Sequence, residues 1–73
     1  MNKAAIESAK LIINTVSPLL KKYRVSFDDA PPAYFVGYLS ENIADGVISR
    51  KAAQETIEFM MWMRFDETYR MEK

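Results

Sequence analysis

The chain contains no histidine and no cysteine. Histidine is the usual general base near neutral pH and a common metal ligand, and cysteine supplies thiolate ligands and disulfides. Without these residues the sequence lacks the usual means of activating a serine or threonine nucleophile. We therefore expect a non-catalytic protein with no metal site and no cofactor.

Glycine is scarce, and the charges cancel. Gly37 and Gly46 are the two glycines of the chain, which excludes a glycine-rich phosphate-binding loop. Lys and Arg total 10 and Asp and Glu total 10, so the sequence lacks the basic excess typical of nucleic-acid-binding domains. No apolar run approaches the roughly 20 residues that span a membrane. We expect a cytoplasmic protein without a membrane segment.

The length of 73 residues corresponds to a single small domain. A domain of this size buries roughly 60% of the surface that its unfolded chain exposes, and it is marginally stable by itself. Since no disulfide can add stability, we expect stability to come from packing or from self-association.

Capped segments with apolar residues at helical spacing predict an all-α fold, a small bundle of three helices at about 3–23, 32–45 and 49–71. Asn2 is the predicted N-cap of the first helix. The predicted core face of this helix consists of Ile6, Ala9, Ile13, Val16, Leu20 and Tyr23, widened by Ala5, Ile12 and Leu19.

Pro18 interrupts the first helix. A proline inside a helix removes a backbone donor and clashes with the carbonyl group four residues earlier, which here belongs to Asn14. Either the helix is kinked at Pro18, or Ser17 caps a new helix that has Pro18 as its first residue. Because the apolar spacing continues through Pro18, we favour a kinked helix.

The connection to the second helix contains the adjacent residues Asp28 and Asp29. Two neighbouring carboxylates could bind a metal ion, but turn formation explains them without one. Phe27, just before them, is expected to fold back onto the core.

The second helix has Gly46 as its predicted C-terminal cap. Its predicted core residues are Phe35, Tyr38, Leu39 and Ile43, and its predicted solvent-facing residues are Ser40, Glu41 and Asp45. The segment 34–39 is aromatic and β-branched, as a strand would be, but the chain offers no partner strand. We therefore predict a helix, in which Gly37 marks a close approach to another helix.

The third helix, capped by Ser49, is apolar on nearly all sides between Phe59 and Phe65. At about 100° per residue, Ala53, Ile57, Met60 and Met61 share one side, which we expect to face the core. The other sides of the helix must also be covered, so Trp62, Phe65 and Tyr69 either fill the small core of this chain or bind a partner. The residues predicted to bind this partner are Phe59, Trp62, Met63, Phe65 and Tyr69.

The segment 43–60 resembles a known family. It contains the turn sequence D-G-x-I-S at 45–49, a basic residue at Arg50, and a helix with spaced alanines and the pattern E-x-M at 58–60. It is similar to the C-terminal tail domain of the GatB subunit of tRNA-dependent amidotransferases, which is shared with YqeY-like proteins. The same residues also form a general helix stop and cap, so common capping rules could produce them without shared ancestry.

The resemblance implies an all-helical domain that helps to hold tRNA, with catalysis in other domains and subunits. Arg50 and Lys51 would be the first candidates for RNA contact, and the basic end of the first helix would supplement them. The candidate RNA-contacting residues are Lys21, Lys22, Arg24, Arg50 and Lys51. Cations at a helix C-terminus also stabilise the helix dipole, which explains the first three of these without RNA.

Two function classes therefore remain. The first is a protein-interaction module that binds a partner, or a second copy in a homodimer, through the methionine- and aromatic-rich third helix. The second is an accessory RNA-binding domain. Convergence of the five cations on one face would favour RNA, whereas scattered cations beside an open aromatic surface would favour protein binding.

Overall fold

A computed structural model of the chain describes residues 2–66. Within this range every element is helical and no strand is present, which confirms the predicted all-α bundle of three helices. The first predicted helix comprises α1 (Lys3–Leu11), the π-helical segment η1 (Ile12–Val16) and α2 (Ser17–Tyr23). The others are α3 (Ala33–Ala44) and α4 (Arg50–Phe65), and a short 3₁₀ helix, η2 (Phe27–Asp29), lies between α2 and α3. None of the helices in this range is long and apolar enough to cross a membrane.

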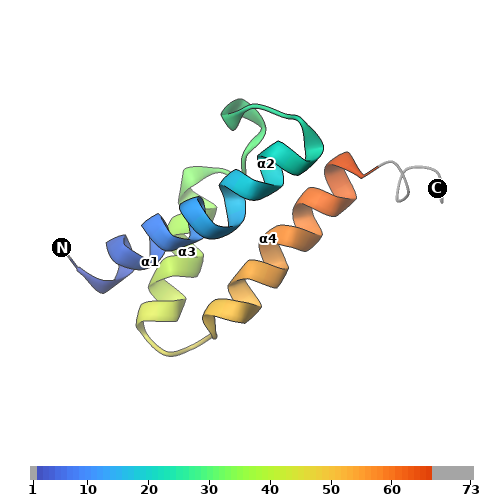
Figure 1. Cartoon of the computed structure of the whole chain (residues 1–73). Helices are drawn as coiled ribbons and strands as arrows, with labels where there is room; N and C mark the ends of the chain where they lie inside the picture. The colour runs from blue at the N-terminus through green and yellow to red at the C-terminus, as the bar shows by residue number, and fades with distance from the viewer. Residues whose placement is uncertain (1, 67–73) are drawn as a thin grey trace.

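The segments α1, η1 and α2 form one continuous helical rod, which Figure 1 shows in blue to teal. The helix α3 packs mainly against α1, and α4 packs along η1 and α2. The start of α4 lies near α1, where Arg50 pairs with Glu7, and its end lies near the end of α2, where Phe65 contacts Tyr23. The rod is therefore the element on which both other helices pack.

The predicted helix boundaries rest on local hydrogen bonds. The side chain of Asn2 accepts the Ala5 N–H at 2.7 Å, and the Ser49 hydroxyl accepts the Ala52 N–H at 3.0 Å, so both predicted N-caps are confirmed. Gly46 follows α3 with a φ of 75°, a left-handed conformation that glycine adopts without strain. These caps fix where α1 and α4 begin and where α3 ends.

The rod accommodates Pro18 by widening just before it. In η1 the N–H of Ser17 donates to the carbonyl oxygen of Ile12, five residues earlier, instead of the usual four. Val16 and Ser17 keep helical dihedral angles, and Val16, the residue before α2, makes no side-chain cap. The interruption predicted at Pro18 therefore takes the form of a π-helical turn, and α2 continues from it as part of one rod.

The core combines residues from all three predicted helices. The buried apolar side chains are Leu11, Val16, Leu20, Val36, Leu39, Ala53, Ile57 and Met61. The predicted core side of α4 is thus confirmed for Ala53, Ile57 and Met61, while Met60 is half-buried. Each Å² of apolar surface that is buried stabilises the fold by about 25 cal/mol, so this cluster is the main source of stability.

The predicted core face of the first helix is confirmed for Val16 and Leu20 and wrong before them. Ile13 is 67% exposed, Ile6 and Ala9 are also exposed, and Leu11, which the prediction omitted, is completely buried. The π-helical turn adds a residue to one turn, so a regular helical spacing that fits the buried Val16 and Leu20 is out of phase with the buried positions before the turn.

On α3 the predictions for Tyr38 and Ser40 are both wrong. Tyr38 is exposed, whereas Ser40 is completely buried. Burial of this hydroxyl is tolerated because it donates to the carbonyl oxygen of Val36 at 2.7 Å. A Cβ atom added at Gly37 would meet nothing within 4 Å, so no close helix contact occurs there.

The structure also differs from the predictions for Phe27 and for the end of the third helix. Phe27 does not fold onto the core and is 65% exposed. The helix α4 ends at Phe65, since Asp66 has an extended backbone. The predicted continuation to residue 71 lies outside the described residues.

Candidate functional site

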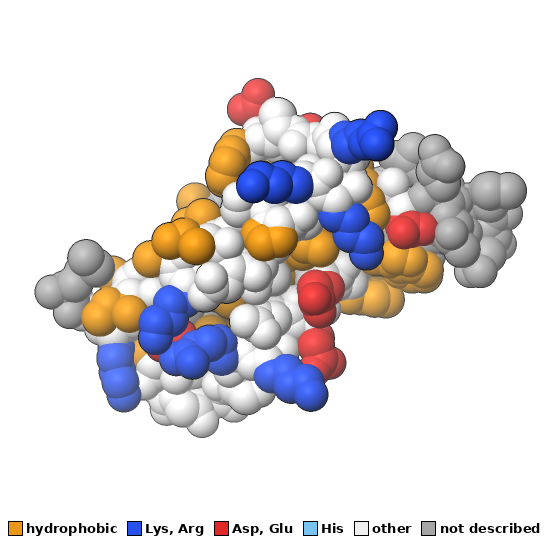
Figure 2. Space-filling model, in the orientation of Figure 1, with side chains coloured by type: hydrophobic (Ala, Val, Ile, Leu, Met, Phe, Trp, Pro, Cys, Tyr) orange, Lys and Arg blue, Asp and Glu red, His pale blue; other side chains and the backbone are white. Residues whose placement is uncertain are grey.

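A shallow groove of about 360 Å³ lies between α2 and the second half of α4. Its lining residues are Leu19, Lys22 and Tyr23 from α2 and Glu58, Phe59 and Trp62 from α4. Figure 2 shows hydrophobic side chains and charges of both signs meeting where these two helices lie side by side. We call this feature the α2–α4 groove.

The aromatic part of the groove comes from α4. Phe59 and Trp62 are three residues apart and therefore neighbours on the helix surface. Their rings are stacked, with centroids 5.9 Å apart and an interplanar angle of 25°. Phe59 is 56% exposed and Trp62 is half-buried, so the pair presents a rigid aromatic surface to solvent. Such a surface provides a large contact area at a small cost in conformational entropy.

The polar part of the groove carries one charge of each sign. Lys22 comes from α2 and Glu58 from α4, and both side chains are exposed. The Lys22 ammonium lies 5.3 Å from the centroid of the Tyr23 ring, within the range of a cation–π interaction. The groove is thus an apolar floor between a cation on one helix and an anion on the other.

A second aromatic contact lies beside the groove. The Tyr23 and Phe65 rings have centroids 6.2 Å apart and are tilted by 37°. The Arg64 guanidinium lies 4.9 Å from the centroid of the Phe65 ring. The contact between Tyr23 and Phe65 joins the end of α2 to the end of α4, beside the groove.

The structure brings together part of the predicted partner-binding set. Phe59 and Trp62 line the groove, while Met63 and Phe65 are half-buried nearby on α4. Tyr69 lies outside the described residues. Sequence reasoning missed the α2 wall, because Leu19 and Tyr23 were assigned to the core face and Lys22 to the RNA-contacting set. The spacing of these three residues on one face of α2 is the signal that was available.

The five candidate RNA-contacting residues do not converge. Lys21, Lys22 and Arg24 lie at the end of α2, whereas Arg50 and Lys51 lie at the start of α4. Figure 2 shows Lys and Arg side chains in two separate groups on the face displayed. A helix rises about 1.5 Å per residue, so the start and end of α4 are roughly 22 Å apart.

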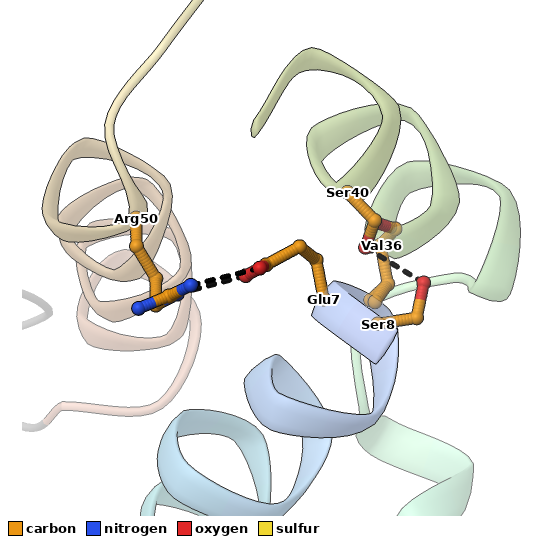
Figure 3. Close-up of polar contacts among 5 residues, drawn as sticks. All are labelled: Glu7, Ser8, Val36, Ser40 and Arg50. Carbon is orange, nitrogen blue, oxygen red and sulfur yellow. Dashed lines mark hydrogen bonds and ion pairs between the residues drawn. The ribbon is translucent and has the colours of Figure 1, made fainter. Parts of the chain in front are cut away.

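Arg50 is engaged in a contact within the domain (Figure 3). Its Nε and Nη2 atoms each donate to one carboxylate oxygen of Glu7, at 2.8 Å in both cases. This bidentate geometry is the strongest form of an arginine–carboxylate pair. The hydrogen bonds from Arg50 hold the pKa of the Glu7 carboxyl below its ordinary value, against the opposing effect of desolvation. The pair fixes the start of α4 against α1.

We expect this pair to make stability depend on pH in the acid range. The folded pKa of Glu7 is lowered, so the pair stabilises the fold fully above the unfolded glutamate pKa of about 4.5. That contribution is lost as the pH falls through the lower, folded value. Glu7→Gln should therefore lower the melting temperature at pH 7, and the difference from the wild type should shrink below about pH 4.

Thermal unfolding followed by circular dichroism from pH 7 downwards would measure this difference. Glu55→Gln, at an exposed position on α4, is the matched control and should change the melting temperature little at any pH. A Glu7→Gln effect that stays constant across the acid range would contradict an ionic role for Glu7.

The two adjacent carboxylates of the connection lie in a short 3₁₀ turn. Among residues 2–66, no three Asp or Glu side chains are placed to share a metal ion. Asp28 and Asp29 belong to η2, and the Ser26 hydroxyl accepts the Asp28 N–H at 3.3 Å. This geometry is that of a capped turn, as the turn interpretation predicted.

Comparison of the chain with protein-family models, curated proteins and solved structures finds no match. Its function therefore has to be inferred from its own residues and their geometry.

Proposed function

We propose that this chain is a non-catalytic, cytoplasmic protein-interaction module that associates through the α2–α4 groove, most simply with a second copy of itself. The observation that carries the proposal is the stacked pair formed by Phe59 and Trp62, with Phe59 more than half exposed at the groove. Aromatic residues and methionine are enriched at protein interfaces, and tryptophan and tyrosine are frequent anchors of binding energy.

The burial pattern of α4 supports this proposal. Its buried side chains, Ala53, Ile57 and Met61, follow one side of the helix at spacings of four residues. Met60 and Met63 are half-buried, so apolar surface remains accessible beside the aromatic pair. Methionine adapts its shape to different surfaces, which suits a contact formed by association. Association would add the buried apolar area that a short chain lacks.

The charges of the groove suit a two-fold symmetric contact. In such a contact the same surface on two copies meets, so Lys22 of one copy can face Glu58 of the other, and the reverse pairing occurs at the same time. The groove would then be complementary to itself in charge as well as in its aromatic floor. A groove with charges of one sign only would repel a second copy of itself and would require a different partner protein.

The solution mass of the wild type across a dilution series tests this proposal, and reversal of charges sharpens it. Lys22→Glu and Glu58→Lys should each weaken the dimer by about ten-fold or more, because each places like charges opposite one another. The double variant restores opposite charges and should recover most of the affinity. Leu19 and Phe59 are unchanged in all three, so the apolar floor is the same throughout.

A wild type that remains monomeric at high concentration would rule out self-association. In that case the groove belongs to a different protein partner, and a pull-down with the wild type and a Phe59→Ala variant becomes the decisive measurement. Failure of the double charge variant to recover association would show that Lys22 and Glu58 do not face each other in the dimer.

The second candidate is an accessory RNA-binding domain, as the resemblance of segment 43–60 to the GatB tail implies. The observation in its favour is that Lys21, Lys22 and Arg24 lie together at the end of α2. Against it stand the balanced charge and the pairing of Arg50 with Glu7. A group of three cations neutralises few phosphates, so affinity for RNA should be low and sensitive to salt.

We expect weak or no binding of tRNA at physiological salt. Fluorescence anisotropy with labelled tRNA at two salt concentrations would measure it. Submicromolar binding that disappears when Lys21, Lys22 and Arg24 are changed to Glu would favour the RNA-binding candidate over the interaction module.

A further inference from the structure

A second hollow, of about 420 Å³, lies where the connection between α2 and α3 passes over the contact between α1 and α3. Ile12 and Val16 of η1 and Val36 of α3 form its apolar base. Phe27 and Pro31, both from the connection, contribute to its wall. No residue of α4 lines it, so this hollow is distinct from the α2–α4 groove. We call it the α1–α3 cleft.

The walls of the α1–α3 cleft leave apolar surface in contact with water. Phe27 is 65% exposed although it lines the cleft, and Ile12 is 39% exposed. Water in such a site finds few hydrogen-bonding partners, so its displacement by an apolar molecule is favourable. The volume lies near the lower end of the roughly 300–1,000 Å³ range of small-molecule sites. It suits a ligand of one or two fused rings.

The polar side chain that lines the cleft is Ser8, which is hydrogen-bonded to Ser40 (Figure 3). The Ser40 hydroxyl donates to the carbonyl oxygen of Val36 at 2.7 Å, and a carbonyl group can only accept. The proton of the 2.7 Å contact between Ser8 and Ser40 must therefore come from Ser8. Because the Ser8 proton is used in this way, its oxygen can act toward a ligand only as an acceptor.

We propose that the α1–α3 cleft binds a small, flat, apolar molecule that carries one hydrogen-bond donor, such as an indole or phenol ring. The ring lies over Val16 and Val36 and against Phe27, and its N–H or O–H group donates to the Ser8 oxygen. This assignment combines the apolar walls, the volume and the acceptor-only state of Ser8. It does not depend on the α2–α4 groove or on self-association.

Indole and benzofuran are the probes that test this inference. The two rings have nearly the same shape, but indole has an N–H donor where benzofuran has an oxygen acceptor. A hydrogen bond of ordinary net strength makes indole bind roughly three- to ten-fold more tightly than benzofuran. Titrations followed by backbone amide chemical shifts in two-dimensional NMR give both affinities. They also locate the site, since the shifts should centre on Ile12, Phe27 and Ala33.

Two variants separate the hydrogen bond from the cleft itself. Ser8→Ala leaves Ser40 bonded to Val36, so the fold is retained, and the preference for indole over benzofuran should disappear. Ala33→Phe, at an exposed lining position, should block the cleft and abolish the shifts caused by both probes. The inference is overturned if the wild type binds the two probes equally, binds neither of them, or shows its shifts at Phe59 and Trp62.

Discussion

Leu11→Ala should lower the free energy of unfolding by about 2–5 kcal/mol, the usual cost of truncating a fully buried leucine. Leu11 is 0% exposed and lies in the rod segment against which α3 packs. Its truncation removes apolar contacts and leaves a cavity that close-packed neighbours fill only in part. For a domain of this length such a loss is a large share of the total stability of roughly 5–15 kcal/mol.

Ile13→Ala is the matched control for this prediction. Ile13 lies two residues further along the same rod and is 67% exposed. The substitution removes a side chain of comparable size. Its truncation should change stability by less than about 0.5 kcal/mol, as is usual at the surface. Urea unfolding of both variants at low protein concentration would measure the two values. Equal effects of the two substitutions would contradict the assignment of the core face of the rod.

Sequence patterns predicted the helices well because their boundaries are set by local chemistry. Asn2, Ser49 and Gly46 act through hydrogen bonds or backbone angles within a few residues, and their roles follow from residue type alone. The helical interpretation of segment 34–39 also followed from an elementary constraint, since a strand needs a partner. These features need no knowledge of the tertiary structure.

The faces of the rod could not be predicted in the same way. Ile6, Leu11, Ile12 and Ile13 lie on several sides of the helix, so apolar spacing alone does not select one side. The choice depends on contacts with distant residues, which include the pairing of Glu7 with Arg50. The buried Ser40 illustrates the same limit, because its hydroxyl accepts a hydrogen bond from Ser8 of the distant helix α1.

Of the two walls of the α2–α4 groove, only the residues of α4 were predicted from the sequence. The aromatic residues of α4 were identifiable because apolar side chains surround this helix, and a single packing face cannot bury all of them. The α2 wall depends on the parallel course of α2 and α4, which results from the rod continuing through Pro18. A helix broken at Ser17 would have placed Lys22 and Tyr23 elsewhere. The groove is therefore a consequence of tertiary structure that residue spacing alone does not reveal.

Trp62→Ala should weaken self-association by about 2 kcal/mol or more, which corresponds to roughly 30-fold in the dissociation constant. Trp62 is half-buried in the α2–α4 groove and stacked on Phe59, so its ring is held in place before a partner binds. Anchors held in this way lose little entropy on association. Sedimentation equilibrium across a dilution series would measure the effect.

Because Trp62 is half-buried, its truncation also removes packing within the domain, and a second variant is needed to separate the two roles. Phe59→Ala truncates the more exposed partner of the stack, so it should weaken association while the melting temperature at low concentration changes little. Tyr34→Ala removes an exposed aromatic residue of α3, away from the groove, and should leave the solution mass unchanged. If Trp62→Ala lowers stability while Phe59→Ala has no effect on mass, the stacked pair serves the fold and the interaction surface lies elsewhere.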